Sequence, residues 1–145
     1  MKQISVIVAC AFLLCSMIAL IQNPWSIRIG KKELANEQKN KMGDTITLQK
    51  SKLKETDTLY VQRNLLGFTA ENSVVVLSVK NSADAVIKET RNAANTKLFA
   101  AQLPVKELLA SPEFVKGKFI NIYLTIISRP ENLRETVLMG VLKLK

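Results

Sequence analysis

The chain has 145 residues, 48% of them hydrophobic, and carries 21 Lys and Arg against 12 Asp and Glu, a formal net charge of +9. This length suits one domain with a sizeable core, and the positive balance favours anionic partners such as glycans, phospholipid head groups or nucleic acid. Histidine is absent and the two cysteines, Cys10 and Cys15, lie near the N-terminus, which excludes thiol and imidazole catalysis and the usual zinc sites from the body. We therefore expect no metal and no cofactor.

An apolar run covers residues 4–21 and follows a short start that carries Lys2. A basic start before an apolar run is typical of a secretory signal peptide, and we assign residues 1–22 to a signal peptide or membrane anchor. The run reaches the lower end of transmembrane length, so membrane attachment through residues 4–21 is one alternative. Lipid attachment at Cys10 is another, because the Ile-Val-Ala sequence before this cysteine resembles a bacterial lipobox.

The charges around this run oppose the usual rule for export. Arg28, Lys31 and Lys32 place more positive charge after the run than before it. A buried N-terminal helix of a cytosolic protein is therefore a further alternative. We favour export to a secreted or periplasmic location, because a small β domain would have to cover the run on all sides.

From Trp25 onward, short runs with a two-residue apolar period alternate with polar stretches. These runs are residues 25–29, 46–48, 59–66, 73–80, 86–87 and 97–103. Together with a C-terminal pair they give about seven to eight strands, at the spacing of an antiparallel sandwich. We therefore predict that residues 23–145 form one all-β domain, an antiparallel Ig-like β-sandwich.

One short helical crossover interrupts the strands. Pro104 can occupy a first helical turn, and Leu108 and Leu109 follow at helical spacing. The Ser-Pro pair after them can end that turn and begin another, which Gly117 ends. We expect this segment to cross from one sheet to the other, with Leu108, Leu109 and Phe114 in the core.

The last two apolar runs, residues 118–127 and 136–145, predict a long antiparallel hairpin around a turn that holds Pro130. The first run places an uninterrupted aliphatic set on one face: Ile120, Ile122, Leu124 and Ile126. The second run is apolar on both faces. Burial of both faces favours a binding module, whereas an exposed face of Val137, Met139 and Val141 would indicate an assembly subunit.

Lysines are concentrated in residues 30–54. Lys50, Lys52 and Lys54 recur at every second residue, which predicts three ammonium groups on one side of an extended strand. Such a row could contact a polyanion. Alternatively, it could protect an exposed sheet edge from pairing with another chain.

Nucleic acid and enzymatic functions fit the sequence less well. The aromatic residues are scattered and do not interleave with the lysine row, as a single-strand binding surface would require. Ser51 and Lys54 match a Ser-x-x-Lys element, but that element needs a helix start, and its companion motifs are absent. The carboxylates that could pair across a cleft all fall in or beside predicted turns: Asp44, Asp57, Glu71 and Asp84.

We therefore expect an exported, non-catalytic module of the cell envelope that binds an anionic glycan, a lipid surface or a protein partner. The alternative is a structural or assembly subunit that pairs through a strand edge or through the apolar hairpin face.

Overall fold

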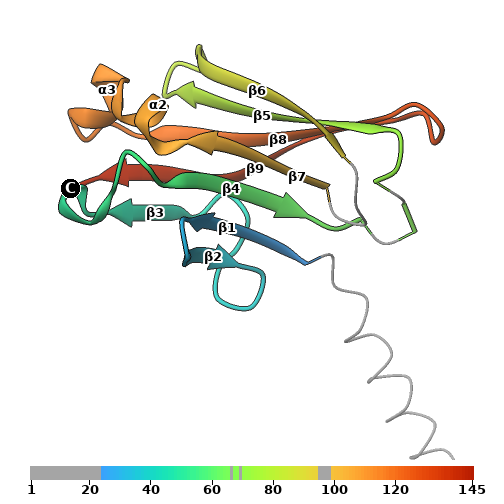
Figure 1. The fold of residues 1–145 in the computed structure, drawn as a ribbon, viewed down its shortest axis with the longest axis horizontal. Helices are drawn as coiled ribbons and strands as arrows, with labels where there is room; N and C mark the ends of the chain where they lie inside the picture. The colour runs from blue at the N-terminus through green and yellow to red at the C-terminus, as the bar shows by residue number, and fades with distance from the viewer. Residues whose placement is uncertain (1–23, 66, 69, 95–98) are drawn as a thin grey trace, which may run out of the picture.

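Two β-sheets, stacked face to face, make up most of the part of the chain that the structure describes (Figure 1). The structure is a computed structural model, and it describes residues 24–65, 67–68, 70–94 and 99–145. The four-stranded sheet has the order β2 (Lys32–Asn36), β1 (Trp25–Ile29), β4 (Thr58–Arg63), β7 (Phe99–Pro104). The five-stranded sheet has the order β3 (Thr45–Leu48), β9 (Leu133–Leu144), β8 (Ile120–Ser128), β5 (Ser73–Asn81), β6 (Val86–Ala94). The prediction of a β-rich, two-sheet fold is confirmed.

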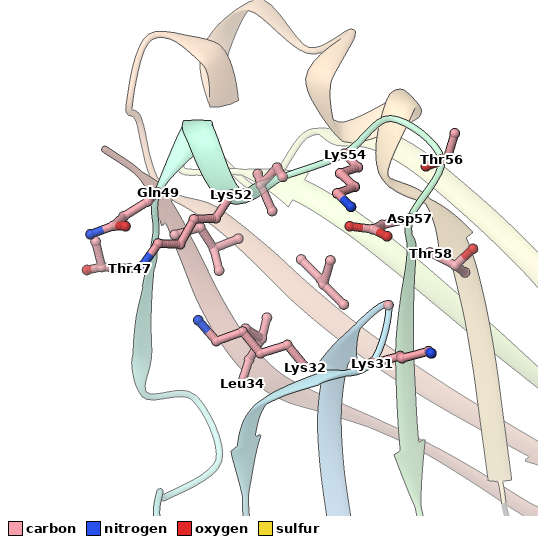
Figure 2. Close-up of a pocket in the computed structure, with 14 residues that line it drawn as sticks. Lys31, Lys32, Leu34, Thr47, Gln49, Lys52, Lys54, Thr56, Asp57 and Thr58 are labelled. Carbon is pink, nitrogen blue, oxygen red and sulfur yellow. The ribbon is translucent and has the colours of Figure 1, made fainter.

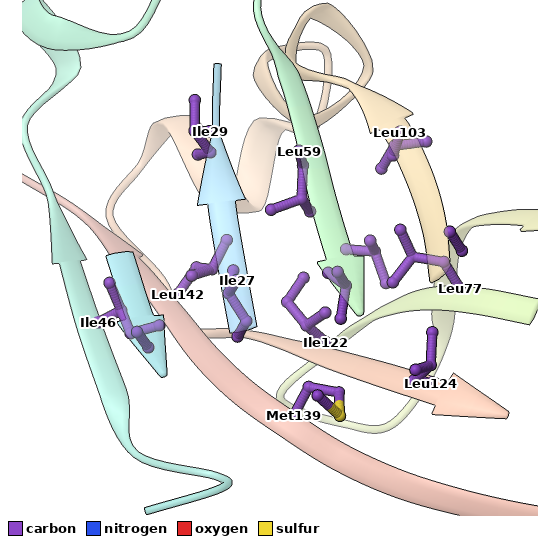
Figure 3. Packing of buried hydrophobic residues seen from close by; sticks show 14 of the residues in the cluster. Ile27, Ile29, Ile46, Leu59, Leu77, Leu103, Ile122, Leu124, Met139 and Leu142 are labelled. Carbon is purple, nitrogen blue, oxygen red and sulfur yellow. The ribbon is translucent and has the colours of Figure 1, made fainter. Parts of the chain in front are cut away.

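One cluster of hydrophobic side chains, most of them aliphatic, fills the space between the sheets (Figure 3). Ile27 and Leu59 come from the four-stranded sheet and are 0% exposed. Ile122 and Leu124 come from the five-stranded sheet and are 0% and 1% exposed. Burying a side chain of this size stabilises the fold by about 1.5–3 kcal/mol, so the core dominates the favourable side of folding.

The C-terminal hairpin forms as predicted, between β8 and β9. The register shifts between Ile122 and Tyr123, where β9 carries an extra residue, Met139. This β-bulge reverses the alternation of β9, so the expectation that Val137, Met139 and Val141 share one face is wrong. Met139 is 1% exposed and Val137 packs against the core cluster, whereas Val141 is half-buried on the outer face.

Gly140 lies next to this bulge, between the two sheets. A Cβ atom at Gly140 would lie 2.9 Å from Cδ1 of Ile27 and 3.4 Å from Cδ1 of Ile46. Ile27 belongs to the opposite sheet and Ile46 to the adjacent strand β3 (Figure 3). Because glycine has no side chain, both isoleucines can pack against the β9 backbone at this point.

Two strand assignments from the sequence need correction. β3 runs parallel to β9, with Thr45 opposite Val141 and Leu48 opposite Leu144. Most of the chain separates these strands, so no tight turn imposes an antiparallel direction on them. The sequence pattern also misses β2, which has only two adjacent apolar residues and pairs with β1 through the turn at Gly30. The described residues therefore form nine strands, more than the seven to eight predicted.

The helical crossover is confirmed. Two short helices, α2 (Val105–Leu109) and α3 (Pro112–Val115), join β7 of the four-stranded sheet to β8 of the five-stranded sheet. Leu108 is 1% exposed and Phe114 is 0% exposed, so both are core residues as predicted. Leu109 is only half-buried, at the margin of the core cluster.

The two long sides of the sandwich differ. On one side, the hydroxyl of Thr90 in β6 donates a hydrogen bond to the carbonyl of Gln102 in β7 at 3.1 Å, so the edges of the two sheets meet. On the other side, β2 and β3 are the edge strands, and no hydrogen-bonded pairing of the described strands connects them. This second side leaves room for a cleft.

The segment assigned to a signal peptide or anchor, residues 1–22, lies outside the described residues. Within the described ranges, no helix combines the length and the apolar character needed to cross a membrane. The carbonyl of Pro24 accepts a hydrogen bond from the amide of Asn64 at 2.7 Å, and Trp25 is 6% exposed. The packed fold that the structure describes therefore begins at residue 24.

Gly140→Ala is expected to destabilise the fold by about 1–3 kcal/mol, because the new methyl group would collide with Ile27. Ile27→Val removes the colliding Cδ1 atom and alone costs about 0.5–1.5 kcal/mol. The loss in the double variant should be smaller than the sum of the single losses by at least about 0.5 kcal/mol. Urea unfolding followed by circular dichroism gives the three free energies, and additive losses would contradict the close approach at Gly140.

Candidate functional site

A cleft opens at one end of the sandwich, beside the edge strands β2 and β3 (Figure 2). Its volume is about 800 Å³, within the range of small-molecule sites in proteins. Its walls are the β1–β2 turn, the end of β3 with the 3-10 helix η1 (Lys50–Lys52), and the loop that leads into β4. Segments distant in the sequence therefore meet at this cleft.

The cleft is strongly positive. Four lysines line it, Lys31, Lys32, Lys52 and Lys54, and among the described lining residues only Asp57 carries a carboxylate. All four lysines are exposed, and the ion pairs formed within the described ranges use other side chains. Lys32 and Lys52 extend toward the same side of the cleft, one from β2 and the other from η1 (Figure 2). Unpaired ammonium groups of this number attract anions through a salt-sensitive potential.

The β1–β2 turn is fixed against the β4 loop by Gly30. Its φ is +55°, in the left-handed region that favours glycine, and its amide donates a hydrogen bond to the carbonyl of Thr58 at 3.0 Å. A Cβ atom at Gly30 would lie 2.9 Å from Oδ1 of Asp57. The backbone of Asp57 is held in turn by a bond from its amide to the carbonyl of Lys54 and by a bond from the amide of Val105 to its carbonyl. The wall that carries Lys31 and the wall that carries Lys54 therefore have a fixed relative position.

The neutral lining is partly apolar and partly hydroxylic. Ile29 and Leu48 are each 5% exposed and form part of the floor. The cleft is also lined by three threonines and one glutamine, namely Thr47, Thr56, Thr58 and Gln49. Such a lining can hydrogen-bond a ligand's hydroxyl groups while the lysines neutralise its anionic groups.

The predicted strand through Lys50, Lys52 and Lys54 is wrong, because Lys50–Lys52 form the 3-10 helix η1. The ladder between β3 and β9 stops at the hydrogen bond from the amide of Lys50 to the carbonyl of Lys145, at 2.9 Å, and the chain then turns. This turn brings Lys52 and Lys54 to the cleft and leaves Lys50 outside its lining. The three lysines therefore do not form a straight row along a sheet edge.

Lys31 and Lys32 are the cleft residues that the sequence did not connect with Lys52 and Lys54. Both lie in the lysine-rich residues 30–54, so the composition of this segment already indicated that they could belong to a basic site. Their position opposite η1 depends on the pairing of β2 with β1 and on the packing of the two sheets. Neither can be derived from the spacing of the lysines.

The other residues considered from the sequence do not assemble into a site within the described ranges. Ser51 lies in η1, and no hydrogen bond of the described residues links its side chain to Lys54. Asp44 accepts a bond from the amide of Lys41, and Asp84 pairs with Lys80 at 3.2 Å. The described residues contain no cluster of His, Cys, Asp or Glu that could hold a metal ion. Cys10, the candidate lipidation site, lies outside the described residues.

Comparison with known proteins adds no relative to this picture. No protein-family model matches the chain, and neither a curated protein nor a solved structure matches it.

Proposed function

We propose that this chain is an exported, non-catalytic, Ig-like module of the cell envelope that binds an anionic partner in the cleft. The observation that carries the proposal is the charge of the cleft lining, which holds four lysines without an ion pair among the described residues and one carboxylate, that of Asp57. A concave site lined by one sign of charge concentrates field lines and raises the local concentration of oppositely charged ligands. The non-catalytic part rests on a body without histidine or cysteine.

The strand orders support the Ig-like part of the proposal. In variable-type immunoglobulin domains, the sheet that contains the last strand has the order G-F-C-C′, and the other sheet begins A-B-E. The orders β9-β8-β5-β6 and β1-β4-β7 correspond to these two series in chain order. The disulfide that links strands B and F in antibody domains has no counterpart in a body without cysteine, so aliphatic packing alone joins β4 and β8 across the core.

A second function, assembly through a strand edge, has one supporting observation. The carbonyl of Asp44 bonds to the amide of Val141, and this alternation leaves the backbone groups of Thr45 and Thr47 directed to the open edge of β3. No lysine or proline lies within β3 to block pairing with another chain. The edge is only four residues long, and Met139 of the hairpin is buried, so we rank this function second.

The anion-binding proposal is tested by elution from a heparin column. Lys52→Gln with Lys54→Gln should lower the salt concentration at which the protein elutes, corresponding to roughly 3- to 10-fold weaker binding. Arg129→Gln with Arg134→Gln removes the same charge at the β8–β9 turn and should have a much smaller effect. Asp57→Asn should delay elution, because it removes the carboxylate of the cleft. Equal shifts for the two double variants would show that only net charge matters and would contradict a localised site.

The export proposal is tested by the mass and location of the native protein. We expect an N-terminus at about residues 20–24, just after the apolar run, and recovery from the periplasmic or secreted fraction. Residues from Trp25 onward should be retained, because this side chain is buried in the core. Intact-mass measurement on native material decides the question, and a soluble cytosolic form that keeps Met1 would overturn the export proposal.

A further inference from the structure

Positive charge continues beyond the cleft across the same end of the sandwich. The amide of Lys50 bonds to the carbonyl of Lys145, and the amide of Lys145 bonds to the carbonyl of Leu48, at 2.9 and 2.8 Å. The end of β9 therefore lies directly beside η1. On its other side, a Cβ atom at Gly117 would lie 3.0 Å from the carbonyl of Leu144, so the loop between α3 and β8 contacts the end of β9.

The loop beyond β9 is itself basic. Lys116 and Lys118 flank Gly117 and are both exposed. The ammonium group of Lys143 lies over the ring of Phe119, 4.9 Å from its centroid. The cleft lysines, η1, the end of β9 and this loop therefore form one basic track.

The opposite end of the sandwich does not share this character. There Arg63 donates to Glu135 at 2.8 Å, and the side chain of Arg63 is only 11% exposed. The exposed Arg129 and Arg134 at that end are matched in number by the carboxylates of Glu71 and Glu131. Acidic residues on the cleft end are partly engaged: Glu107 pairs with Lys88 at 2.7 Å, and Glu113 accepts a bond from Asn81. Glu55 is the exposed carboxylate on the loop beside the cleft. The net charge is therefore concentrated on the cleft end.

We propose that the partner is a linear anionic glycan that occupies the cleft and continues along the basic track to Lys116 and Lys118. This inference rests on the proposed function and extends it, because a small anion would need only the cleft lysines. The track crosses from η1 over β9 to the start of β8, which adds two strand spacings, about 10 Å, to the length of the cleft. A path of that length matches a chain of several sugar units.

The shape and lining of the cleft favour a glycan over two other polyanionic surfaces. A flat bilayer can contact the rim of a concave cleft but cannot follow it down to the buried residues Ile29 and Leu48. Single-stranded nucleic acid is usually held by several aromatic side chains that stack on its bases. The described cleft lining contains no aromatic residue, and the track beyond the cleft offers the exposed ring of Phe119, which already lies under the ammonium group of Lys143. Hydroxyl, amide and carboxylate groups beside ammonium groups instead suit the alternating hydroxyl and anionic groups of an acidic polysaccharide.

The test compares heparin fragments of two lengths, a disaccharide and an octasaccharide, by calorimetry on protein with its native N-terminus. We expect the octasaccharide to bind at least about 10-fold more tightly. Lys52→Gln with Lys54→Gln should weaken the binding of both fragments. Lys116→Gln with Lys118→Gln should weaken octasaccharide binding roughly 3- to 10-fold and leave the affinity for the disaccharide unchanged.

The control removes Arg129 and Arg134 at the far turn and should change neither affinity. If the change at Lys116 and Lys118 leaves octasaccharide binding intact while the change at Lys52 and Lys54 does not, the extended track is refuted and the cleft function stands. If the change at Lys52 and Lys54 alters the affinity for neither fragment, the proposed function itself is refuted. Tighter binding to phosphatidylglycerol vesicles or to single-stranded DNA than to the octasaccharide would overturn the assignment to a glycan.

Discussion

The packing of the β8–β9 hairpin against the four-stranded sheet is the interaction on which the rest of the structure depends. Ile120, Ile122, Leu124 and Ile126 present one continuous aliphatic face, each at most 1% exposed. The bulge at Met139 then redirects β9, so that Leu142 and Leu144 stay in the core while Gly140 admits Ile27 from the opposite sheet. This close approach lets the two sheets pack tightly at the middle of the shared core.

The position of the cleft follows from this packing. β9 is paired with β8 on one side and with the short strand β3 on the other. Since β3 ends at Leu48 and the chain turns away through η1, the edge of the five-stranded sheet stops short of the β1–β2 turn. The gap between them is lined by groups from both sheets, and its lysines have no acidic partners within the described residues. The packing of the core therefore determines where the cleft lysines lie, although none of them belongs to the core.

The sequence predicts the parts of this fold in which one local pattern decides the structure. The two-residue period of residues 120–126 identifies a central strand. Pro104, followed by Leu108 and Leu109 at helical spacing, identifies the crossover helix. The sequence does not predict the parts of the fold that depend on contacts between distant segments. The parallel direction of β3, the bulge at Met139 and the strand β2 all depend on which segment lies alongside.

The candidate site shows the same division. The sequence identifies a lysine-rich segment and the individual residues Lys52 and Lys54. The spacing of these lysines at every second residue predicts a strand. The structure has no strand there, because the pairing of β3 with β9 ends at Lys145 and the chain then turns. The sequence also cannot join them to Lys31 and Lys32, whose approach depends on the stacking of two sheets. Composition therefore predicts the charge of the site, and tertiary packing determines its location.

The most direct test of this account is an NMR titration of the isotopically labelled protein with an anionic oligosaccharide. If the basic end of the sandwich is the binding surface, amide shifts should change at Lys31, Lys32 and residues 49–58, and with a long fragment also at residues 116–118. Shifts confined to the β8–β9 turn at residues 129–134, or no shifts at low salt, would contradict it.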